Sequence, residues 1–458
     1  MTSPSAFYNA GHTFDLPKCH PNTRVAILER LKNWLVGNVE PNASILWLNG
    51  AAGSGKSCIA RSVAEWCQEQ NLLLASFFFF RSDSSRNSVK HFIPTLAYNI
   101  IQTVPGARPI IDYALRSDPH IFAKTIDIQM LHLVFEPLAH PAPHMFSGAS
   151  NYQAAQFTPE IHSSPVSSLP YVFIVDGLDE CLDQAEQKAI IRLFASVLER
   201  NIGWKILIAS RSEQAIRSLF DAFVPRDLSS RIALSNEYDS DEDIRRFLND
   251  KFAEIKTTHF RKAFIPVEWP SPFHIDQLVR KSSAQFIYAA TVIRYVSSDY
   301  ESPVDRLRSV LDNGRIPISK SGISDSRDLP FTELDTLYAQ ILQTASERLR
   351  VDNLKTVPLV AALSILLGTH NDFLDEFHES PADAFSKVLR LDIDIVSLIL
   401  AELSSILSIQ RSCIVVYHAS LEDYLFDRSR SGFFWVDECQ VWTDLFFYWL
   451  SATELHFR

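Results

Sequence analysis

The sequence predicts an α/β fold in which helices cover both faces of a parallel sheet, followed by a mostly helical second half. Up to about residue 236, short apolar runs alternate with amphipathic helical segments. This alternation is typical of parallel strands joined by crossover helices. Beyond that point, helical segments follow one another with almost no strand-like run between them.

The composition indicates a globular protein with large hydrophobic cores. The chain has 458 residues, of which 47% are hydrophobic and 21% are charged. Its formal net charge of -11 argues against a general nucleic-acid-binding surface. Its six cysteines include no C-x-x-C pair, which favours a reducing compartment and no structural zinc. The N-terminus has no signal-peptide pattern and no apolar run is long enough to span a membrane, so we expect a cytoplasmic protein.

A glycine-rich turn lies between a predicted strand and a predicted helix. A short polar lead over residues 1–21 and an amphipathic helix over residues 22–36 come first, and the apolar run Ile45–Leu48 then predicts a buried strand. The turn that follows has the spacing G-x-x-x-x-G-K-S, which is the phosphate-binding loop, or P-loop. A helical pattern over residues 58–70 completes the strand–loop–helix context that this motif needs.

The P-loop predicts nucleotide binding. Gly53 and Gly55 let the backbone bend so that successive N–H groups point into one concavity, and the N-terminus of the following helix adds partial positive charge. Lys56 can reach the β- and γ-phosphates, and the Ser57 hydroxyl is placed for Mg²⁺. The alternative is an ordinary glycine turn that caps a helix. The predicted nucleotide contacts are Gly50, Ala51, Ala52, Gly53, Ser54, Gly55, Lys56, Ser57 and Cys58.

The rest of the sheet follows in the same pattern. The near-continuous apolar run over residues 72–80 predicts a central parallel strand. Residues 139–169 lose periodicity and are rich in Pro, Ser, His and Ala, which predicts a disordered insertion. Further strands are expected at residues 171–175, 204–209 and 231–234, and helices at residues 88–102, 109–116, 130–138, 184–199 and 213–220.

Charged residues stand at the ends of these strands. Asp176 has the position of the acidic residue that holds the Mg²⁺ shell in a P-loop protein. Asp179 and Glu180 add carboxylates that could orient or activate an attacking water. Arg211 ends another strand, where a cation can contact a γ-phosphate or stabilise developing charge, and Arg81 is a weaker candidate on the same grounds. The alternatives are an acidic helix cap and surface arginines.

The second half of the sequence predicts helices and one short strand. A polar linker over residues 313–330 divides it. Residues 413–417 predict the strand, and His418 follows at the start of a helix. Considered alone, such a histidine is more often structural than a ligand. The predicted helices cover residues 240–255, 276–281, 284–296, 304–311, 334–348, 356–367, 383–389 and 394–407.

With these motifs in place, the chain resembles the NACHT family of STAND nucleotide-binding switches. It is most similar to the fungal, NLR-like branch with a nephrocystin-3-like NACHT domain. The motifs that carry the resemblance are G-A-A-G-S-G-K-S, F-I-V-D-G-L-D-E-C, I-L-I-A-S-R-S-E and V-Y-H-A-S-L-E-D-Y-L. Together they extend the resemblance over about residues 20–440.

The resemblance implies a three-layer αβα P-loop NTPase domain followed by an all-helical domain and a winged-helix-like domain. The NACHT domain is expected over residues 22–236, the helical domain over 237–312, the winged-helix-like domain over 331–440 and a C-terminal helix over 441–458. Relatives of this branch often carry an N-terminal effector domain and C-terminal repeats, and neither is expected within this chain.

The resemblance also implies a signal-transduction switch that binds ATP or ADP with Mg²⁺ and hydrolyses ATP slowly. His418 would contact the β-phosphate of ADP in a closed state, and ATP would favour an open form that assembles as a homo-oligomer. Fungal innate immunity and heterokaryon incompatibility are the implied settings. Protein partners are not identified by the sequence, and neither nucleic acid nor a membrane is expected among the partners. A non-hydrolysing nucleotide-binding scaffold or decoy, and another P-loop ATPase or small-molecule kinase, remain alternatives.

Overall fold

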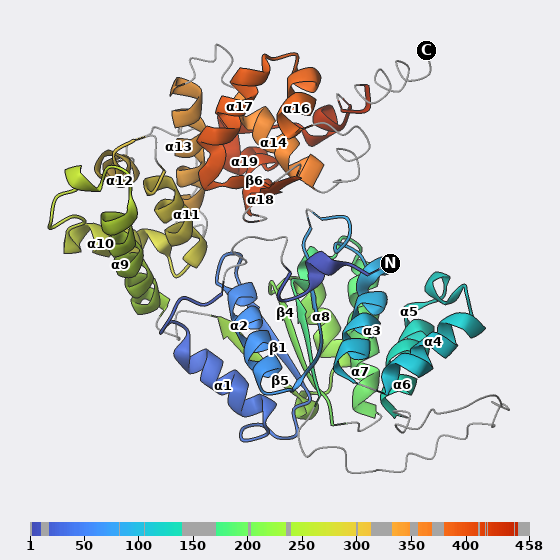
Figure 1. Cartoon of the computed structure of the whole chain (residues 1–458). Helices are drawn as coiled ribbons and strands as arrows, with labels where there is room; N and C mark the ends of the chain where they lie inside the picture. Colours follow the sequence, from blue (N-terminus) through green and yellow to red (C-terminus); the bar gives the residue numbers. More distant parts are fainter. Residues whose placement is uncertain are drawn as a thin grey trace.

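The computed structural model places the chain in two lobes (Figure 1). An α/β lobe contains the described residues up to 234, and a helical lobe contains those from 240 onward. The predicted linker and nearly all of the predicted insertion lie outside the described part of the chain. The structure describes residues 2–10, 18–81, 83–104, 106–139, 171–199, 203–234, 240–298, 301–312, 332–348, 356–368, 380–410, 413–416, 418, 420–443 and 445–447.

The α/β lobe is built on a five-stranded sheet in the order β2-β3-β4-β1-β5. Every neighbouring pair of its strands is parallel. Since β4 lies between β1 and β3, the strand before the P-loop and the strand that ends in Asp176 are not neighbours. The predicted strands are confirmed, and their bounds are β1 (Ile45–Gly50), β2 (Leu73–Phe78), β3 (Val172–Asp176), β4 (Lys205–Ser210) and β5 (Ser229–Leu234).

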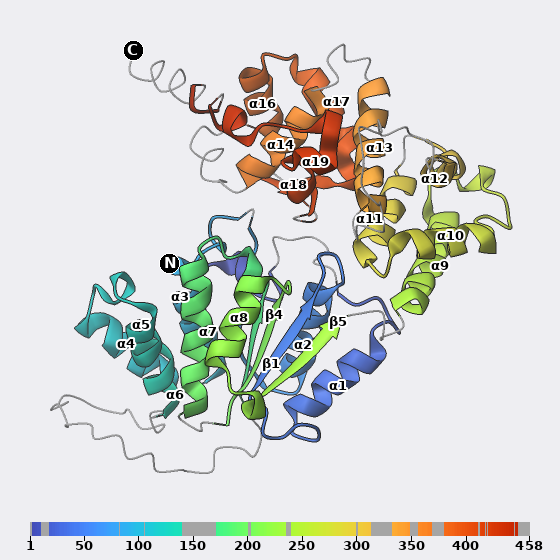
Figure 2. The ribbon, with the colours of Figure 1, turned by 180° about the vertical axis from the view of Figure 1, so that it is seen from behind.

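Helices cover both faces of this sheet (Figure 2). On one face Leu46 and Leu48 of β1 pack in a core with α1 and α2, while Trp47 points into the core of the other face with α3, α7 and α8. Successive side chains of a strand thus point to opposite faces of the sheet, and both faces are buried under helices, so nearly every position of the strand is apolar. The arrangement confirms the predicted three-layer α/β fold. The covering helices are α1 (Val25–Leu35), α2 (Lys56–Glu69), α3 (Phe92–Thr103), α7 (Gln184–Glu199) and α8 (Gln214–Phe223). Outside α3 lie α4 (Ala107–Ser117), α5 (Ile126–Met130), the π-helical turn η4 (Leu131–Phe135) and α6 (Glu136–Ala139).

The start of the chain packs on the α/β lobe. A short helical turn, η1 (Pro4–Ala6), contacts β2, and Ala6 is fully buried. The Ser3 backbone N–H donates to Thr95 Oγ1 at 3.0 Å, and Arg86 Nη1 donates to Ser5 O at 3.1 Å. Part of the polar lead therefore packs against the α/β lobe. The composition of this segment did not indicate such packing.

The helical lobe has one continuous hydrophobic core. Buried side chains in mutual contact extend from Ile244 in the first helix to Leu445 near the end of the described chain. The predicted helical and winged-helix-like segments therefore pack around the same core, and the winged-helix interpretation stays a prediction. No helix in the described part of the chain has both the length and the apolar character of a membrane span. The elements are α9 (Ser240–Thr258), α10 (Pro272–Ser282), α11 (Phe286–Val296), α12 (Pro303–Asp312), α13 (Thr332–Arg348), α14 (Thr356–Gly368), α16 (Pro381–Leu389), α17 (Ile393–Glu402), β6 (Leu407–Gln410), β7 (Cys413–Val416), α18 (Ser420–Leu425) and α19 (Arg428–Ser431).

One predicted helix in this lobe is too long. The helix expected over residues 394–407 ends at Glu402, and Leu407 begins β6, which pairs with β7 in an antiparallel hairpin. Leu407 lies opposite Val416 in that hairpin. The apolar run around Leu407 is too short for its periodicity to distinguish a helix from a strand. Its pairing with β7 therefore decides that it is a strand.

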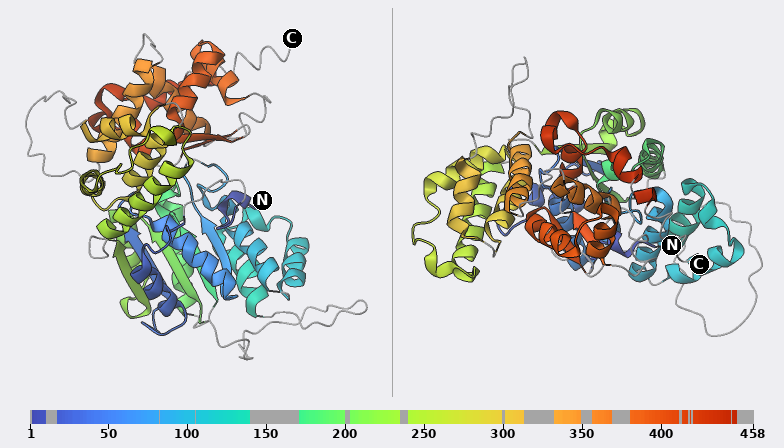
Figure 3. Two further views of the ribbon diagram at one scale, coloured as in Figure 1. Left: turned by 60° about the vertical axis from the view of Figure 1, so that its left-hand side comes forward. Right: turned by 90° about the horizontal axis from the view of Figure 1, so that it is seen from above.

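The helical lobe lies over the edge of the sheet at which the parallel strands end (Figure 3). Residues that follow β2 and β4 make ion pairs with α18, and the loop after β1 contacts the start of α11. In open α/β sheets the carboxyl ends of the strands are the usual place for ligand sites. The fold therefore brings the predicted site residues to the boundary between the lobes.

Candidate functional site

The P-loop connects β1 to α2 at the boundary between the lobes. Gly53 and Gly55 have left-handed backbone conformations, with φ of 73° and 93°. Gly55 occupies the N-cap position of α2, and no side chain caps this helix end. The glycine therefore leaves the first backbone N–H groups of the helix without a cap from the N-cap residue, and the helix dipole favours an anion there. This local geometry fits a phosphate group.

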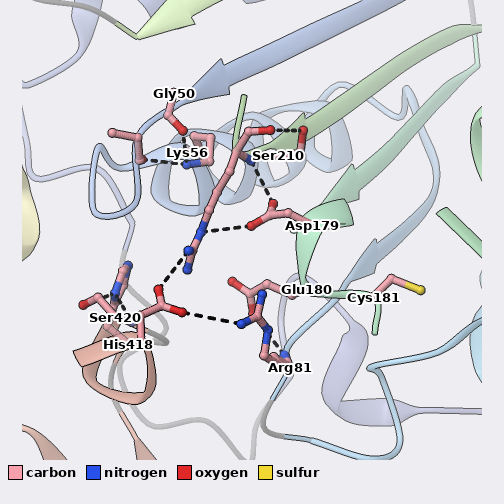
Figure 4. A network of polar contacts seen from close by, with 12 residues as sticks. Gly50, Lys56, Arg81, Asp179, Glu180, Cys181, Ser210, His418 and Ser420 are labelled. Atoms are coloured by element: carbon pink, nitrogen blue, oxygen red, sulfur yellow. Dashed lines mark hydrogen bonds and ion pairs between the residues drawn. The ribbon is translucent and has the colours of Figure 1, made fainter. Parts of the chain in front are cut away.

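Lys56 lies at the mouth of this loop. Its Nζ donates to Gly50 O at 2.9 Å and to Ala51 O at 2.8 Å (Figure 4). Burial lowers the pKa of Lys56, while the charges of Asp179 and Asp176 raise it. The ammonium group is thus held beside the loop by neutral carbonyl groups and lies within electrostatic reach of the carboxylates after β3.

Asp176 and Ser57 form a pair of oxygen donors. Asp176 ends β3, is 3% exposed and accepts a hydrogen bond from the Ser57 side chain. Burial raises the pKa of Asp176 to about 6, although Ser57 and the charge of Arg61 lower it. The Asp176 Oδ1 atom is buried and has no hydrogen-bond partner among the described residues. A partnerless carboxylate oxygen beside a hydroxyl is a ligand set that suits Mg²⁺, so these residues fit the metal.

Asp179 and Glu180 follow in the short turn η5 (Leu178–Glu180), and both are engaged. Asp179 Oδ1 accepts the Arg211 backbone N–H at 2.8 Å, and Asp179 Oδ2 pairs with Arg211 Nε at 3.1 Å. Glu180 accepts the Arg81 backbone N–H at 3.1 Å. Burial, and next the charge of Asp179, raise the pKa of Glu180. Neither residue is an uncommitted carboxylate base in this arrangement.

His418 approaches from the helical lobe, between β7 and α18 (Figure 4). Its Nδ1 accepts the Ser420 backbone N–H at 3.1 Å and lies 2.8 Å from Ser420 Oγ, which in turn lies 2.8 Å from the Tyr338 hydroxyl. Burial, and then the charges of Arg211 and Lys56, lower the pKa of His418 to about 3. The ring is therefore neutral, and because Nδ1 accepts, its proton is on Nε2.

Asp423 joins the two lobes. It lies on α18, where its Oδ2 accepts from Arg211 Nη1 at 2.8 Å and its Oδ1 accepts from Arg81 Nη1 at 3.5 Å. The prediction from sequence included Arg211 and Arg81 but missed Asp423. The available signal was its spacing of three residues after Ser420, which places both side chains on one helical face beside His418.

A second contact between the lobes lies on the P-loop itself. Arg24, with a left-handed φ of 56°, donates from Nη2 to Ser54 O at 3.0 Å and from Nη1 to Ser240 Oγ at 2.8 Å. The Ile287 N–H at the start of α11 donates to Gly53 O at 3.3 Å. A Cβ at position 53 would lie 2.1 Å from Ile287 Cγ2, so only glycine fits under this helix. Sequence reasoning missed Arg24 as well.

The structure thus brings the predicted site residues together at one place. The P-loop, the residues after β3 and Arg211 come from the α/β lobe, and His418 comes from the helical lobe (Figure 4). Cys58 lies in the first turn of α2, and burial raises the pKa of its thiol to about 12, so the thiol keeps its proton.

A comparison with known families gives a match to the first part of the α/β lobe. Residues 23–147 match the family model described as "Nephrocystin 3, N-terminal". This match confirms, for that segment, the resemblance to nephrocystin-3-like NACHT regions. A comparison with curated protein sequences gives no match.

Two solved structures are similar over most of this chain. One is titled "Structure of Drosophila ORC bound to DNA", with a TM-score of 0.37, 13% sequence identity and coverage of 88% of this chain and 86% of that chain. The other is a Walker-type ATPase of Pyrococcus abyssi, with a TM-score of 0.37, 11% identity and coverage of 89% of this chain and 97% of that chain. The sheet, the P-loop and the family match together give this chain a P-loop ATPase-like nucleotide-binding fold.

Proposed function

We propose that this chain is an ATP/ADP-binding signal-transduction switch of the NACHT and STAND type. The observation that carries the proposal is that two lobes supply one site. A phosphate-binding loop and its acidic and basic partners come from the α/β lobe, and a neutral histidine comes from the helical lobe. A ligand held by both lobes stabilises the arrangement in which both contact it.

ADP is the proposed ligand of the closed arrangement. The N-terminus of α2 and Lys56 would bind the phosphates, and the Nε2–H of His418 would donate to the β-phosphate. A neutral histidine can donate without carrying charge, and Ser420 fixes its ring through Nδ1. This contact across the lobes would keep the protein closed.

ATP with Mg²⁺ is proposed to favour an open form that self-associates as a homo-oligomer. Ser57 and Asp176 would hold the metal, which supplies positive charge near the phosphates when bound. Arg211 would stabilise the charge of the γ-phosphate. Slow hydrolysis of ATP would reset the switch. For this step Asp179 and Glu180 would leave their contacts with Arg211 and Arg81 and position the attacking water. As in the relatives that the chain resembles, the setting would be fungal innate immunity or heterokaryon incompatibility.

The nucleotide that co-purifies with the protein tests this proposal. We expect ADP in the isolated full chain and a larger particle mass after exchange to ATP, measured by chromatography of the extracted nucleotide and by light scattering. Lys56→Ala should weaken nucleotide binding by about a hundredfold. Lys18→Ala, which removes an exposed lysine of the same lobe, is the matched control and should bind normally. A wild-type protein that binds neither ADP nor ATP would overturn the proposal.

One observation favours a second candidate, a nucleotide-binding protein that does not hydrolyse ATP. Both oxygens of Asp179 contact Arg211, and the raised pKa of Glu180 favours its protonated form, so neither residue is placed here to activate water as a free carboxylate. Phosphate release by the wild type, Asp179→Asn and Glu180→Gln separates the two functions. Equal background rates in all three proteins would favour the non-hydrolysing candidate.

A further inference from the structure

The ion pairs across the lobes bring together two arginines and one carboxylate. Asp423 accepts from Arg211 Nη1 at 2.8 Å and from Arg81 Nη1 at 3.5 Å, one arginine at each of its oxygens. The three side chains are 20–25% exposed, so solvent screens the pairs only in part. The arginines follow β4 and β2, whereas Asp423 is on α18.

A carboxylate and a terminal phosphate use the same donors on an arginine. The guanidinium group presents a planar fork that binds either anion with similar geometry. In this structure Arg211 directs Nε to Asp179 and Nη1 to Asp423. Burial lowers the pKa of Arg211, but Asp423 and next Asp179 raise it above its usual value, because these anions stabilise the charged guanidinium. A further anion at Arg211 would therefore have to share the guanidinium group with these two carboxylates or displace one of them.

The local charge also disfavours an additional phosphate. Asp179 and Glu213 lie in the same region as Asp423. Burial and the charge of Asp179 raise the pKa of Glu213, and Asp423 contributes to that rise. Another anion would experience the same repulsion. A diphosphate that ends at the β-phosphate avoids most of this cost.

We infer that Asp423 makes the closed arrangement selective for nucleoside diphosphate over triphosphate, because it occupies Arg211 and Arg81 in place of a γ-phosphate. This inference rests on the proposed nucleotide-binding function and adds a specificity-determining residue to it. Asp423 acts by competing for the arginines, while His418 acts by contacting the part that both nucleotides share. The loss of Asp423 therefore changes the ratio of the two affinities rather than both affinities together.

Calorimetric titration of the full chain with ADP, and with a non-hydrolysable ATP analogue, tests this inference. The titrations use wild type, Asp423→Asn and the control Glu438→Gln, which removes an exposed carboxylate of the same lobe. Asp423→Asn should bind the triphosphate about tenfold more tightly relative to ADP than wild type does, because a neutral amide neither holds the arginines as firmly nor repels the phosphate. Glu438→Gln should keep the wild-type ratio.

Each other outcome has a defined meaning. If both affinities fall equally in Asp423→Asn, Asp423 holds the two lobes together without selecting between the nucleotides. That result overturns the inference and does not affect the proposed function. If wild type binds neither nucleotide, both the function and the inference fail. If Asp423→Asn does not fold by circular dichroism, the wild-type ratio is compared at low and high salt. Screening should then reduce the preference for ADP, and a ratio independent of salt overturns the inference.

Discussion

The neighbours of His418 fix the orientation and the charge of its ring. Ser420 donates its backbone N–H to Nδ1, and nearby cations together with burial keep the ring neutral. Sequence alone offered a histidine at a helix start, which is usually structural. The position opposite the P-loop comes from the packing of the two lobes.

The neutral state of His418 predicts a pH effect on stability. Its pKa is depressed to about 3 in the folded protein, against an ordinary value of 6.5. The stabilisation from the neutral ring is therefore complete above pH 6.5 and is lost as the pH falls toward 3, because the unfolded chain binds the proton first. Between pH 7.5 and 5.5, wild type should lose about 1 kcal/mol more unfolding free energy than His418→Gln.

Urea unfolding of the two proteins at both pH values measures this difference. All other titrating groups are common to both proteins, so they cancel in the comparison. Identical losses in wild type and His418→Gln would show that the ring is protonated in the folded state or is accessible to solvent there.

The residues that the sequence proposed for the site lie close to the ends of strands. Lys56 and Asp176 stand at recognisable distances from a strand end, and the structure places them together. Asp423 and Arg24 were missed, because their partners are 212 and 30 residues away in the chain. Contacts of that kind depend on how the lobes meet, and no local pattern encodes them.

The turn after β3 depends on one glycine. Gly177 has a φ of 70°, and a Cβ there would lie 3.0 Å from the backbone oxygen of Phe79. Gly37 also has a positive φ, of 81°, but a Cβ there would meet nothing within 4 Å. A side chain at either position would strain the backbone, but only at position 177 would it also crowd a neighbouring atom.

We expect Gly177→Ala to lower the unfolding free energy by about 2–3 kcal/mol and Gly37→Ala by about 1 kcal/mol. The larger loss arises because the backbone after β2 must move to admit the methyl group. Urea unfolding midpoints of the two variants provide the measurement. Equal losses would mean that the turn relaxes without cost.

Two ion pairs of the helical lobe, one between helices and one within a helix, differ in how far they are exposed to solvent. Arg430 of α19 binds Asp335 of α13 with two hydrogen bonds, of 2.8 and 3.1 Å, and the two side chains are 21% and 16% exposed. Arg308 and Asp305 form a pair within α12 whose side chains are 66% and 65% exposed. Partial burial makes the first pair costly to break, since it leaves Asp335 without its cation.

Arg430→Ala should therefore destabilise the helical lobe by about 2 kcal/mol, whereas Arg308→Ala should change its stability by less than about 0.5 kcal/mol. Thermal unfolding followed by circular dichroism compares the two variants. A loss of similar size in both would show that the Arg430 pair is screened as fully as a surface pair.

At the scale of single elements, segments with strong periodicity were predicted well. The end of one helix was predicted wrongly, in an apolar run too short to show a periodicity. All strands of the large sheet were expected within about two residues of their bounds, because apolar runs flanked by turns are informative there. The helix expected over 394–407 was wrong at its end, because β6 exists only through its pairing with β7. That pairing is a tertiary contact, and the apolar run alone does not encode it.

At the scale of the whole molecule, the two predicted domains of the helical lobe share one hydrophobic core, and the division between them stays a prediction. The polar linker over 313–330 indicated two separate domains, yet buried residues on both sides of it share one core. Linker composition reports on local backbone freedom and says nothing of whether the flanking helices pack together. The shared core joins α11, which contacts the P-loop at Gly53, to α18, which contacts Arg211 and Arg81.

This shared core predicts cooperative unfolding. Leu248 of α9 and Ile399 of α17 are both fully buried in it, while Phe173 of β3 is fully buried in the sheet lobe. Leu248→Ala and Ile399→Ala should each cost about 2–5 kcal/mol and lower the same calorimetric transition. Phe173→Ala should lower the transition of the α/β lobe. Separate transitions for Leu248→Ala and Ile399→Ala would mean that the helical lobe unfolds as two units.

The strand order has a consequence for how the protein is made. β1 pairs only with β4 and β5 within the described sheet, so its first partner begins at Lys205. At a synthesis rate of roughly 5–20 residues per second, the apolar β1 waits on the order of 10–30 seconds before that partner leaves the ribosome. During this interval the strand that leads to the nucleotide loop is an exposed apolar segment with unpaired edges. The demand for a chaperone on the nascent chain should therefore be greatest before β4 emerges, and ribosome profiling of chaperone-bound nascent chains would locate that interval.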